Sequence, residues 1–211
     1  MTTNAEPSRD PADNDDLTGV FKTILRKWLQ SVDDCLPGIV IAVDRTVSPN
    51  VATVQPLIQL KTTANQRVSR AQIVKIPIFQ IGGGGFVLNF PVKPGNMGWI
   101  KANDRDISLF MQSEKEAAPN TNRLHTFADA VFFPDAMFDY TIADEDVDRV
   151  VFQSNNGSAK ISIGTDSIRL KVGAEVLELS AAGLMHNGVN VGSTHEHGGV
   201  EPGGGNTDGP H

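Results

Sequence analysis

Residues 149–194 decide the fold, and they read RVVFQSNNG, SAKISIGTD, SIRLKVGAE, VLELSAAG, LMHNGVNVG and ST. Short runs that alternate between apolar and polar residues recur about every nine residues, which is typical of a repeat protein built from strands. Alternation places one set of side chains on each face of a strand. The aliphatic face holds Ile161, Ile163, Ile168, Leu170, Val172, Leu177, Leu179, Val189 and Val191, and the polar face holds Lys160, Ser162, Arg169, Lys171, Glu178 and Ser180.

The aliphatic stripe is too thin to build a globular core alone. The stretch has no large aromatic side chain after Phe152, so one chain leaves much of the stripe in water. Three chains wound about a common axis would bury the stripes in a narrow prism and would pair every strand edge with a neighbouring chain. We therefore predict a homotrimer with an intertwined trimeric β-helix, or β-prism, over residues 149–194. A single-chain β-helix is the alternative, although its ends and much of its stripe would stay exposed.

The aliphatic stripe leads to a pair of histidines. Counting in steps of two from Val189 places His195 and His197 on the same inward face. On a threefold axis this pair would bring six imidazoles to one level, an octahedral cage for one divalent first-row metal ion per trimer. Without a trimer, the same pair is more often two ordinary surface histidines. The chemistry leaves the metal open: affinity order favours copper or nickel, and six ligands disfavour zinc, which prefers four.

The C-terminal end is glycine-rich and polar, reading GGVEPGGGNTDGPH after the histidine pair. This composition suits a tight cap over the end of a prism, with a floppy tail as the alternative. We assign residues 195–211 to a metal-bearing tip and an apex cap. His186 has the opposite parity to the pair. We expect both His186 and the terminal His211 to be solvated.

Residues 37–138 have a different texture, with β-rich runs separated by turn signals. The runs are GIVIAVD, VATVQPLIQL, AQIVKIPIFQI, GFVLNF, MGWIKAN and ISLFM. About five strands in roughly one hundred residues predict a small barrel or sandwich. Gly82 to Gly85 lie between two runs, where glycine suits a hairpin turn. They lack the Gly-Lys-Ser/Thr that follows in a phosphate-binding loop, so the sequence does not indicate a nucleotide site.

The N-terminal region contains a polar arm and one amphipathic helix. Residues 1–16 have no apolar anchors, and we expect a disordered acidic arm there. From Leu17, apolar residues recur at helical spacing, with Asp16 placed to cap the helix and Pro37-Gly38 to end it. The sequence thus predicts one amphipathic helix over 17–36. Its apolar face would cover a barrel end or pack on symmetry mates, or dock onto a larger assembly.

Residues 139–148 read DYTIADEDVD and interrupt the strand pattern. Their carboxylates could suggest calcium binding or acid/base chemistry. The run has no glycine-centred loop with a closing glutamate, so it does not resemble a calcium loop. We expect a solvated linker.

Charge and cysteine content exclude several classes. The formal net charge of −7 would repel phosphate backbones and anionic membranes at long range, so we expect no nucleic-acid partner. The one cysteine, Cys35, cannot form an internal disulfide, and no run approaches the roughly 20 apolar residues of a spanning helix. The N-terminus has no secretory signal, which predicts synthesis in the cytoplasm without an ordinary export route.

In this order, the motifs resemble those of the central membrane-puncturing spike proteins of contractile-tailed bacteriophages. The N-terminal part is similar to that family's OB-fold domain through VATVQPLIQL, GGGGFVLNFPVKPGN, NDRDIS and RLHTFADAVFFPDA. The C-terminal part is similar to its trimeric β-helix, and THEHGG matches its tip motif. The resemblance implies an all-β fold, an OB-fold barrel at 37–138 followed by the β-helix, and His195 and His197 as ligands of one iron ion per trimer.

The resemblance also implies a function. It is that of a structural, non-enzymatic baseplate spike in the virion, joined to baseplate hub or tail tube proteins and driven by sheath contraction through the host outer membrane. Two rivals come from other classes. A metal-dependent hydrolase would use His195 and His197 with an acidic third ligand and an open coordination position. An OB-fold nucleic-acid-binding module is the other, which the acidic balance and the few exposed aromatic candidates oppose.

Overall fold

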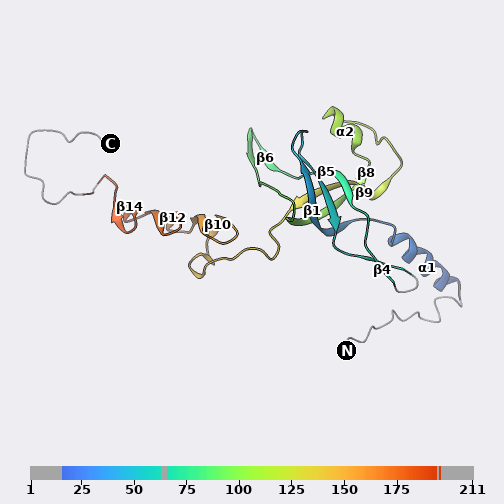
Figure 1. The fold of residues 1–211 in the computed structure, drawn as a ribbon, viewed down its shortest axis with the longest axis horizontal. Coiled ribbons are helices and arrows are strands. Elements are labelled where there is room, and N and C mark those ends of the chain that lie inside the picture. Colours follow the sequence, from blue (N-terminus) through green and yellow to red (C-terminus); the bar gives the residue numbers. More distant parts are fainter. Residues whose placement is uncertain (1–15, 63–65, 194, 196–211) are drawn as a thin grey trace, which may run out of the picture. The chain divides into compact units, whose positions relative to one another are not determined.

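A computed structural model describes residues 16–62, 66–193 and 195 (Figure 1). The chain divides into two compact units, Met1–Met137 and Phe138–His211. Both units are built from strands, a nearly closed barrel in the first and an open sheet in the second, so the predicted all-β class with an OB-fold-like barrel is confirmed. The conformations predicted for the arm and for the tip after His195 lie outside the described residues. No helix in the described ranges is long and apolar enough to cross a bilayer.

The first unit begins with helix α1 (Leu17–Leu29), which is shorter than the predicted span of 17–36. Asp16 caps it as expected, since its carboxylate accepts a hydrogen bond from the Gly19 N–H at 2.6 Å. The helix ends early in a tighter turn, where the Ser31 and Val32 N–H groups donate to the Trp28 and Leu29 carbonyls. The Asp33 N–H then donates to the His125 carbonyl in the barrel at 2.8 Å. Pro37 and Gly38 then lie inside a strand rather than at a helix end.

Five antiparallel strands form the barrel. They are β1 (Cys35–Asp44), β2 (Val51–Pro56), β5 (Ile73–Pro77), β8 (Met97–Arg105) and β9 (Leu124–Pro134), in the spatial order β5-β2-β1-β8-β9. The two edges approach each other beyond β5, where Ile78 bridges Phe132 and the Phe79 N–H donates to the Phe132 carbonyl at 2.8 Å. The sheet therefore nearly closes, and closure removes most of its exposed edge.

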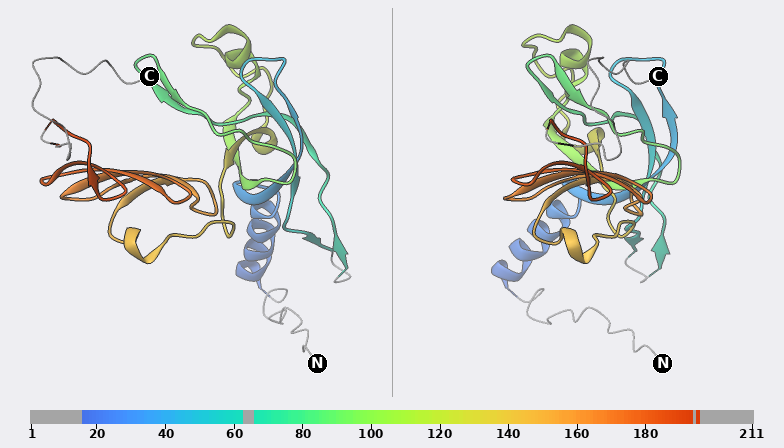
Figure 2. Two further views of the ribbon diagram at one scale, coloured as in Figure 1. Left: turned by 60° about the vertical axis from the view of Figure 1, so that its left-hand side comes forward. Right: turned by 90° about the vertical axis from the view of Figure 1, so that its left-hand side faces the viewer.

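Two short ribbons extend from the barrel on different sides (Figures 1 and 2). One pairs β3 (Leu60–Lys61) with β4 (Arg67–Val68), and the other pairs β6 (Ile81–Gly83) with β7 (Phe86–Leu88). Gly84 and Gly85 turn the second ribbon at positive φ, as the glycine quartet predicts. The barrel interior is packed by Val40, Ala52, Val54, Ile76, Ile78, Val92, Ile100, Ala102, Phe127, Ala130 and Phe132.

One predicted strand is wrong. The run ISLFM forms helix α2 (Ser108–Ser113), because β8 stops at Arg105 and the Asp106 carboxylate accepts the Ser108 N–H at 2.9 Å, which starts a helical turn. The fifth barrel strand is instead β9, within RLHTFADAVFFPDA.

The second unit is an antiparallel meander preceded by a short 3₁₀ helix, η2 (Asp144–Asp146). Its six strands follow chain order: β10 (Val150–Gln153), β11 (Ala159–Ile163), β12 (Ser167–Val172), β13 (Glu175–Ser180), β14 (Gly183–His186) and β15 (Val189–Asn190). Strands β11 to β14 start at residues 159, 167, 175 and 183, so the repeat is eight residues rather than about nine. Each of these inner strands pairs on both edges within its own chain, so these edges need no neighbouring chain.

Candidate functional site

The register of the second sheet confirms the two predicted faces. Residues directly opposite each other in antiparallel strands point to the same side. One row runs Phe152, Ile161, Leu170, Leu177 and His186, and the next runs Val150, Ile163, Ile168, Leu179 and Leu184. We call the side chains of these two rows the aliphatic face.

The aliphatic face is open to water. Ile161 is 42% exposed, Leu170 45% and Leu179 54%, although such side chains are normally buried. The opposite, polar face is covered around Ser162, which is fully buried, and Lys160, which is only 7% exposed. The sheet thus buries Lys160 and Ser162 but exposes its hydrophobic side chains, and a contiguous apolar surface of this kind marks an interaction site.

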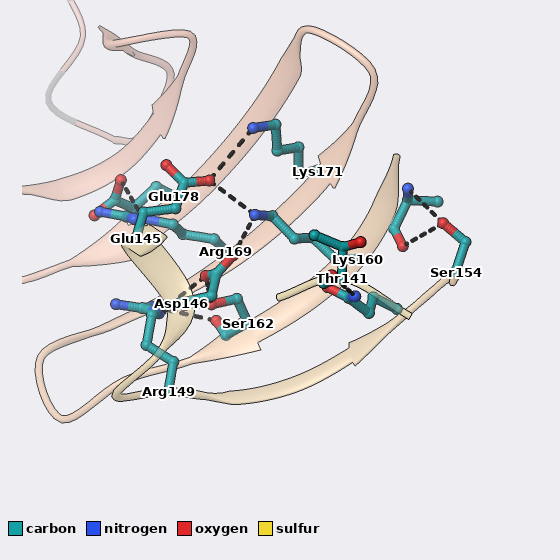
Figure 3. Close-up of polar contacts among 12 residues, drawn as sticks. Thr141, Glu145, Asp146, Arg149, Ser154, Lys160, Ser162, Arg169, Lys171 and Glu178 are labelled. Carbon is teal, nitrogen blue, oxygen red and sulfur yellow. Dashed lines mark hydrogen bonds and ion pairs between the residues drawn. The ribbon is translucent and has the colours of Figure 1, made fainter. Parts of the chain in front are cut away.

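The polar face is covered by η2 through a cluster of charged side chains (Figure 3). The Lys160 ammonium donates to the Asp146 carboxylate and to Glu145 Oε1, the latter at 2.8 Å. Ser162 Oγ donates to Asp146 Oδ1 at 2.6 Å. Arg149 extends the cluster, since its Nε donates to Ser162 Oγ at 2.6 Å. We call Glu145, Asp146, Arg149, Lys160 and Ser162 the linker cluster.

Electrostatics in the linker cluster favour the ionised forms of both central groups. Burial opposes ionisation of Asp146, but hydrogen bonds from Lys160 and Ser162 outweigh it and hold its pKa below the ordinary value. The same contacts, with Asp146 first and Glu145 next, raise the pKa of Lys160 above its ordinary value. The expected solvated linker is therefore wrong at Asp146, which is 1% exposed because Lys160 supplies a buried countercharge.

A second charged cluster lies in the barrel and brings two of the quoted motifs together. Arg123 bonds Asp129 at 2.9 Å and Asp106 at 3.1 Å, and both carboxylates are buried. Hydrogen bonds from Ser108 and then Thr121, with the charge of Arg123, lower the pKa of Asp106 to about 2. NDRDIS and RLHTFADAVFFPDA thus meet to join the start of α2 to β9, which is a structural role.

His195 is placed by a turn rather than by a strand. Strand β15 ends at Asn190, and the His195 N–H donates to the Gly192 carbonyl at 3.1 Å, so counting in steps of two from Val189 fails before the histidine. His195 Nδ1 lies 2.6 Å from the same carbonyl oxygen. Because a carbonyl only accepts, this contact requires a proton on Nδ1, and a backbone contact at one ring nitrogen is usual for a metal-binding histidine.

His197 lies outside the described residues. Within the described ranges, no group of three or more His, Cys, Asp or Glu side chains lies close enough together to hold a metal ion. His186 is exposed, as expected, but it lies on the aliphatic face of the sheet rather than on the opposite one. The turn at Asn187 and Gly188, both at positive φ, puts it opposite Val189 and in line with the aliphatic face, where its Nε2 contacts Glu175 Oε2 at 2.9 Å.

The two units define an all-β protein that combines an OB-fold-like barrel with a sheet whose aliphatic face has no cover within the described chain. Residues 36–135, which span the barrel from β1 to β9, match the family described as the phage protein Gp138 N-terminal domain. The similarity supports a bacteriophage structural protein related to the tail and baseplate. No curated protein matches the chain in sequence.

Proposed function

We propose that the chain is the central spike of a contractile phage tail or a phage-derived injection device. In this proposal three copies assemble into one spike, the barrels join it to baseplate hub or tail tube proteins, and the tip punctures the host outer membrane mechanically. It is a virion component without catalytic activity. The observation that carries the proposal is the burial pattern of the second sheet, whose aliphatic face is exposed while Lys160 and Ser162 on the polar face are buried.

Energetics favour copies of the same chain as the cover. Each half-exposed leucine or isoleucine would gain roughly 1 kcal/mol on full burial. Two rows of such side chains, repeated on three chains, would supply a large driving force without any new polar contact. Threefold closure turns all three aliphatic faces toward one axis, and it leaves the linker cluster of each chain outside.

We further propose that His195 and His197 from the three chains hold one iron ion at the tip, through six imidazole nitrogens. The resemblance to phage spikes suggests iron, and the Nδ1 contact of His195 with Gly192 fits a histidine that presents Nε2 to a metal. Six nitrogen ligands leave no position for substrate or water. The ion would therefore fasten three chain ends together, since metal-binding energy adds to the stability of the assembly.

Localisation on intact particles tests the function. Gold-labelled antibodies against residues 149–194 should decorate the tip of the tail, at the end of the baseplate that meets the host. Particles that carry Leu170→Asp should lack this label and fail to deliver DNA. Label on the capsid, or full infectivity of the Leu170→Asp particles, would contradict the spike.

A further inference from the structure

Helix α1 presents an apolar surface that no described residue covers. Its seven large apolar side chains, Leu17, Val20, Phe21, Ile24, Leu25, Trp28 and Leu29, are all between 45% and 72% exposed. Without Leu29, which lies at the outer edge of this surface, their exposed fractions amount to about three and a half whole side chains, on the order of 600 Å² at the area that large apolar side chains carry. A stable interface buries about 800 Å² on each partner, so this area is close to what such an interface needs.

The spacing of these residues indicates what covers them. Leu17, Phe21, Ile24 and Trp28 follow one another at intervals of four, three and four residues, which are the d, a, d and a positions of a heptad. In this frame Val20 is a g position and Leu25 is an e position five residues later. The g residue of one helix meets the next e residue of its neighbour when helices run parallel, so Val20 and Leu25 would pair between chains.

Charges on α1 agree with self-association. Lys22 and Arg26 occupy the b and f positions, which point away from the axis of a bundle. Only Lys27, at g, lies beside the seam. Packing on a membrane or in an acidic groove requires only one apolar face. A heptad spacing with an apolar pair at g and e, here Val20 and Leu25, is instead a feature of helices that pack on one another.

We infer that the α1 helices of three chains form a parallel three-helix bundle, with Leu17, Phe21, Ile24 and Trp28 inside. The inference rests on the trimer of the proposed function, because one threefold axis makes the helices parallel and equivalent. The bundle would tie the N-terminal helices together within a trimer that the aliphatic face of the second sheet forms. The inferred bundle gives α1 a role in assembly that is separate from the roles of the metal tip and the second sheet.

Disulfide crosslinking in the full-length chain tests the bundle. Cys35 is first replaced by serine, and then Ile24→Cys is compared with Lys22→Cys, a matched variant two residues away on the outer face. A disulfide needs Cα atoms about 4.4–6.8 Å apart, which only the inner position provides between neighbouring helices. Mild oxidation should convert Ile24→Cys to a crosslinked dimer at least ten times faster than Lys22→Cys, and circular dichroism should show equal folding of both.

The outcomes separate the bundle from the spike. If the chain is a trimer by light scattering but the two variants crosslink at the same slow rate, the bundle is wrong and the proposed spike stands. If the chain is a monomer, both are wrong. Co-sedimentation of the chain with phosphatidylglycerol vesicles that Phe21→Glu abolishes would assign α1 to a lipid surface and would also overturn the bundle.

Discussion

Gly98 shows how one residue fixes the packing of the barrel. It lies opposite Gly38 in the β1–β8 pair, and a Cβ atom built there would come within 2.5 Å of the Phe132 ring and would also meet the Phe133 carbonyl oxygen. Phe132 is fully buried at the centre of the barrel, so the ring cannot move aside. The lack of a Cβ atom at Gly98 is what admits this side chain.

We expect Gly98→Ala to destabilise the chain by about 1–3 kcal/mol, the usual range for overpacking a core. Gly83→Ala is the matched control, since nothing lies within 4 Å of its Cβ position and its φ is not positive. Urea unfolding of both variants measures the effect. Equal midpoints would mean that the barrel is not packed as described.

Asp146 makes stability depend on pH. Its pKa is lowered from 3.8 in the folded chain, so it contributes stability above that value, and the contribution is lost as the pH falls through the lower folded pKa. At pH 7, Asp146→Asn should lower the free energy of unfolding by about 2 kcal/mol through lost charged hydrogen bonds. The difference from the parent chain should shrink once the pH falls below 3.8. The exposed Asp148→Asn should show neither effect, and a gap that stays constant down to low pH would contradict the buried ion pair.

At the scale of elements, the strongest prediction concerns strands β11 to β13, where neighbouring residues along the chain lie on opposite faces of the sheet. Leu170→Asp would place three carboxylates around one apolar axis, each costing several kcal/mol, and should convert the trimer to monomers. Arg169→Gln is the matched change on the other face, where it removes a partly exposed ion pair with Glu178 and should cost less than about 1 kcal/mol. Size-exclusion chromatography with light scattering compares them, and a trimer that survives Leu170→Asp would mean that the aliphatic face lies elsewhere.

Elements with strong periodicity could be predicted from the sequence, and those set by contacts far along the chain could not. The two faces of the second sheet follow from alternation alone, as their cross-strand rows confirm. The path of the chain after α1 depends on Asp33 bonding to His125, which is distant in sequence, and α2 follows a turn in which the Asp106 carboxylate accepts the Ser108 N–H. The repeat of eight residues and the position of His186 depend on turns of two residues, such as Asn187-Gly188.

The candidate site was predictable in part for the same reason. The aliphatic face needs only the alternation of apolar and polar residues. The linker cluster needs Asp146 to meet Lys160, and nothing in the acidic run identifies which carboxylate is buried. Lys160 and Lys171 occupy the same polar stripe, so the alternation does not show that Lys160 is buried while Lys171 stays partly exposed. Counting in steps of two from Val189 to His195 assumed a continuous strand, whereas the chain turns at Gly192 before it reaches the histidine.

At the scale of the whole molecule, the metal and the sheet should act separately. We expect elemental analysis to find about one iron ion per three chains, and His195→Ala combined with His197→Ala should abolish it while the trimer persists. The trimer survives because the aliphatic face still holds it. Imidazole binds metal only when neutral, so acid should release the ion. One metal ion per chain, or a coordination position open to small anions, would favour the hydrolase instead.

The mass of the purified full-length chain in solution tests the central claim most directly. Each chain has a mass of 22.7 kDa, so a homotrimer has three times that, about 68 kDa. We predict this trimer mass by light scattering at micromolar concentration, without dissociation on dilution, because the aliphatic face has no other cover within the described chain. A mass of 22.7 kDa would contradict the trimer, and the spike and its metal tip with it.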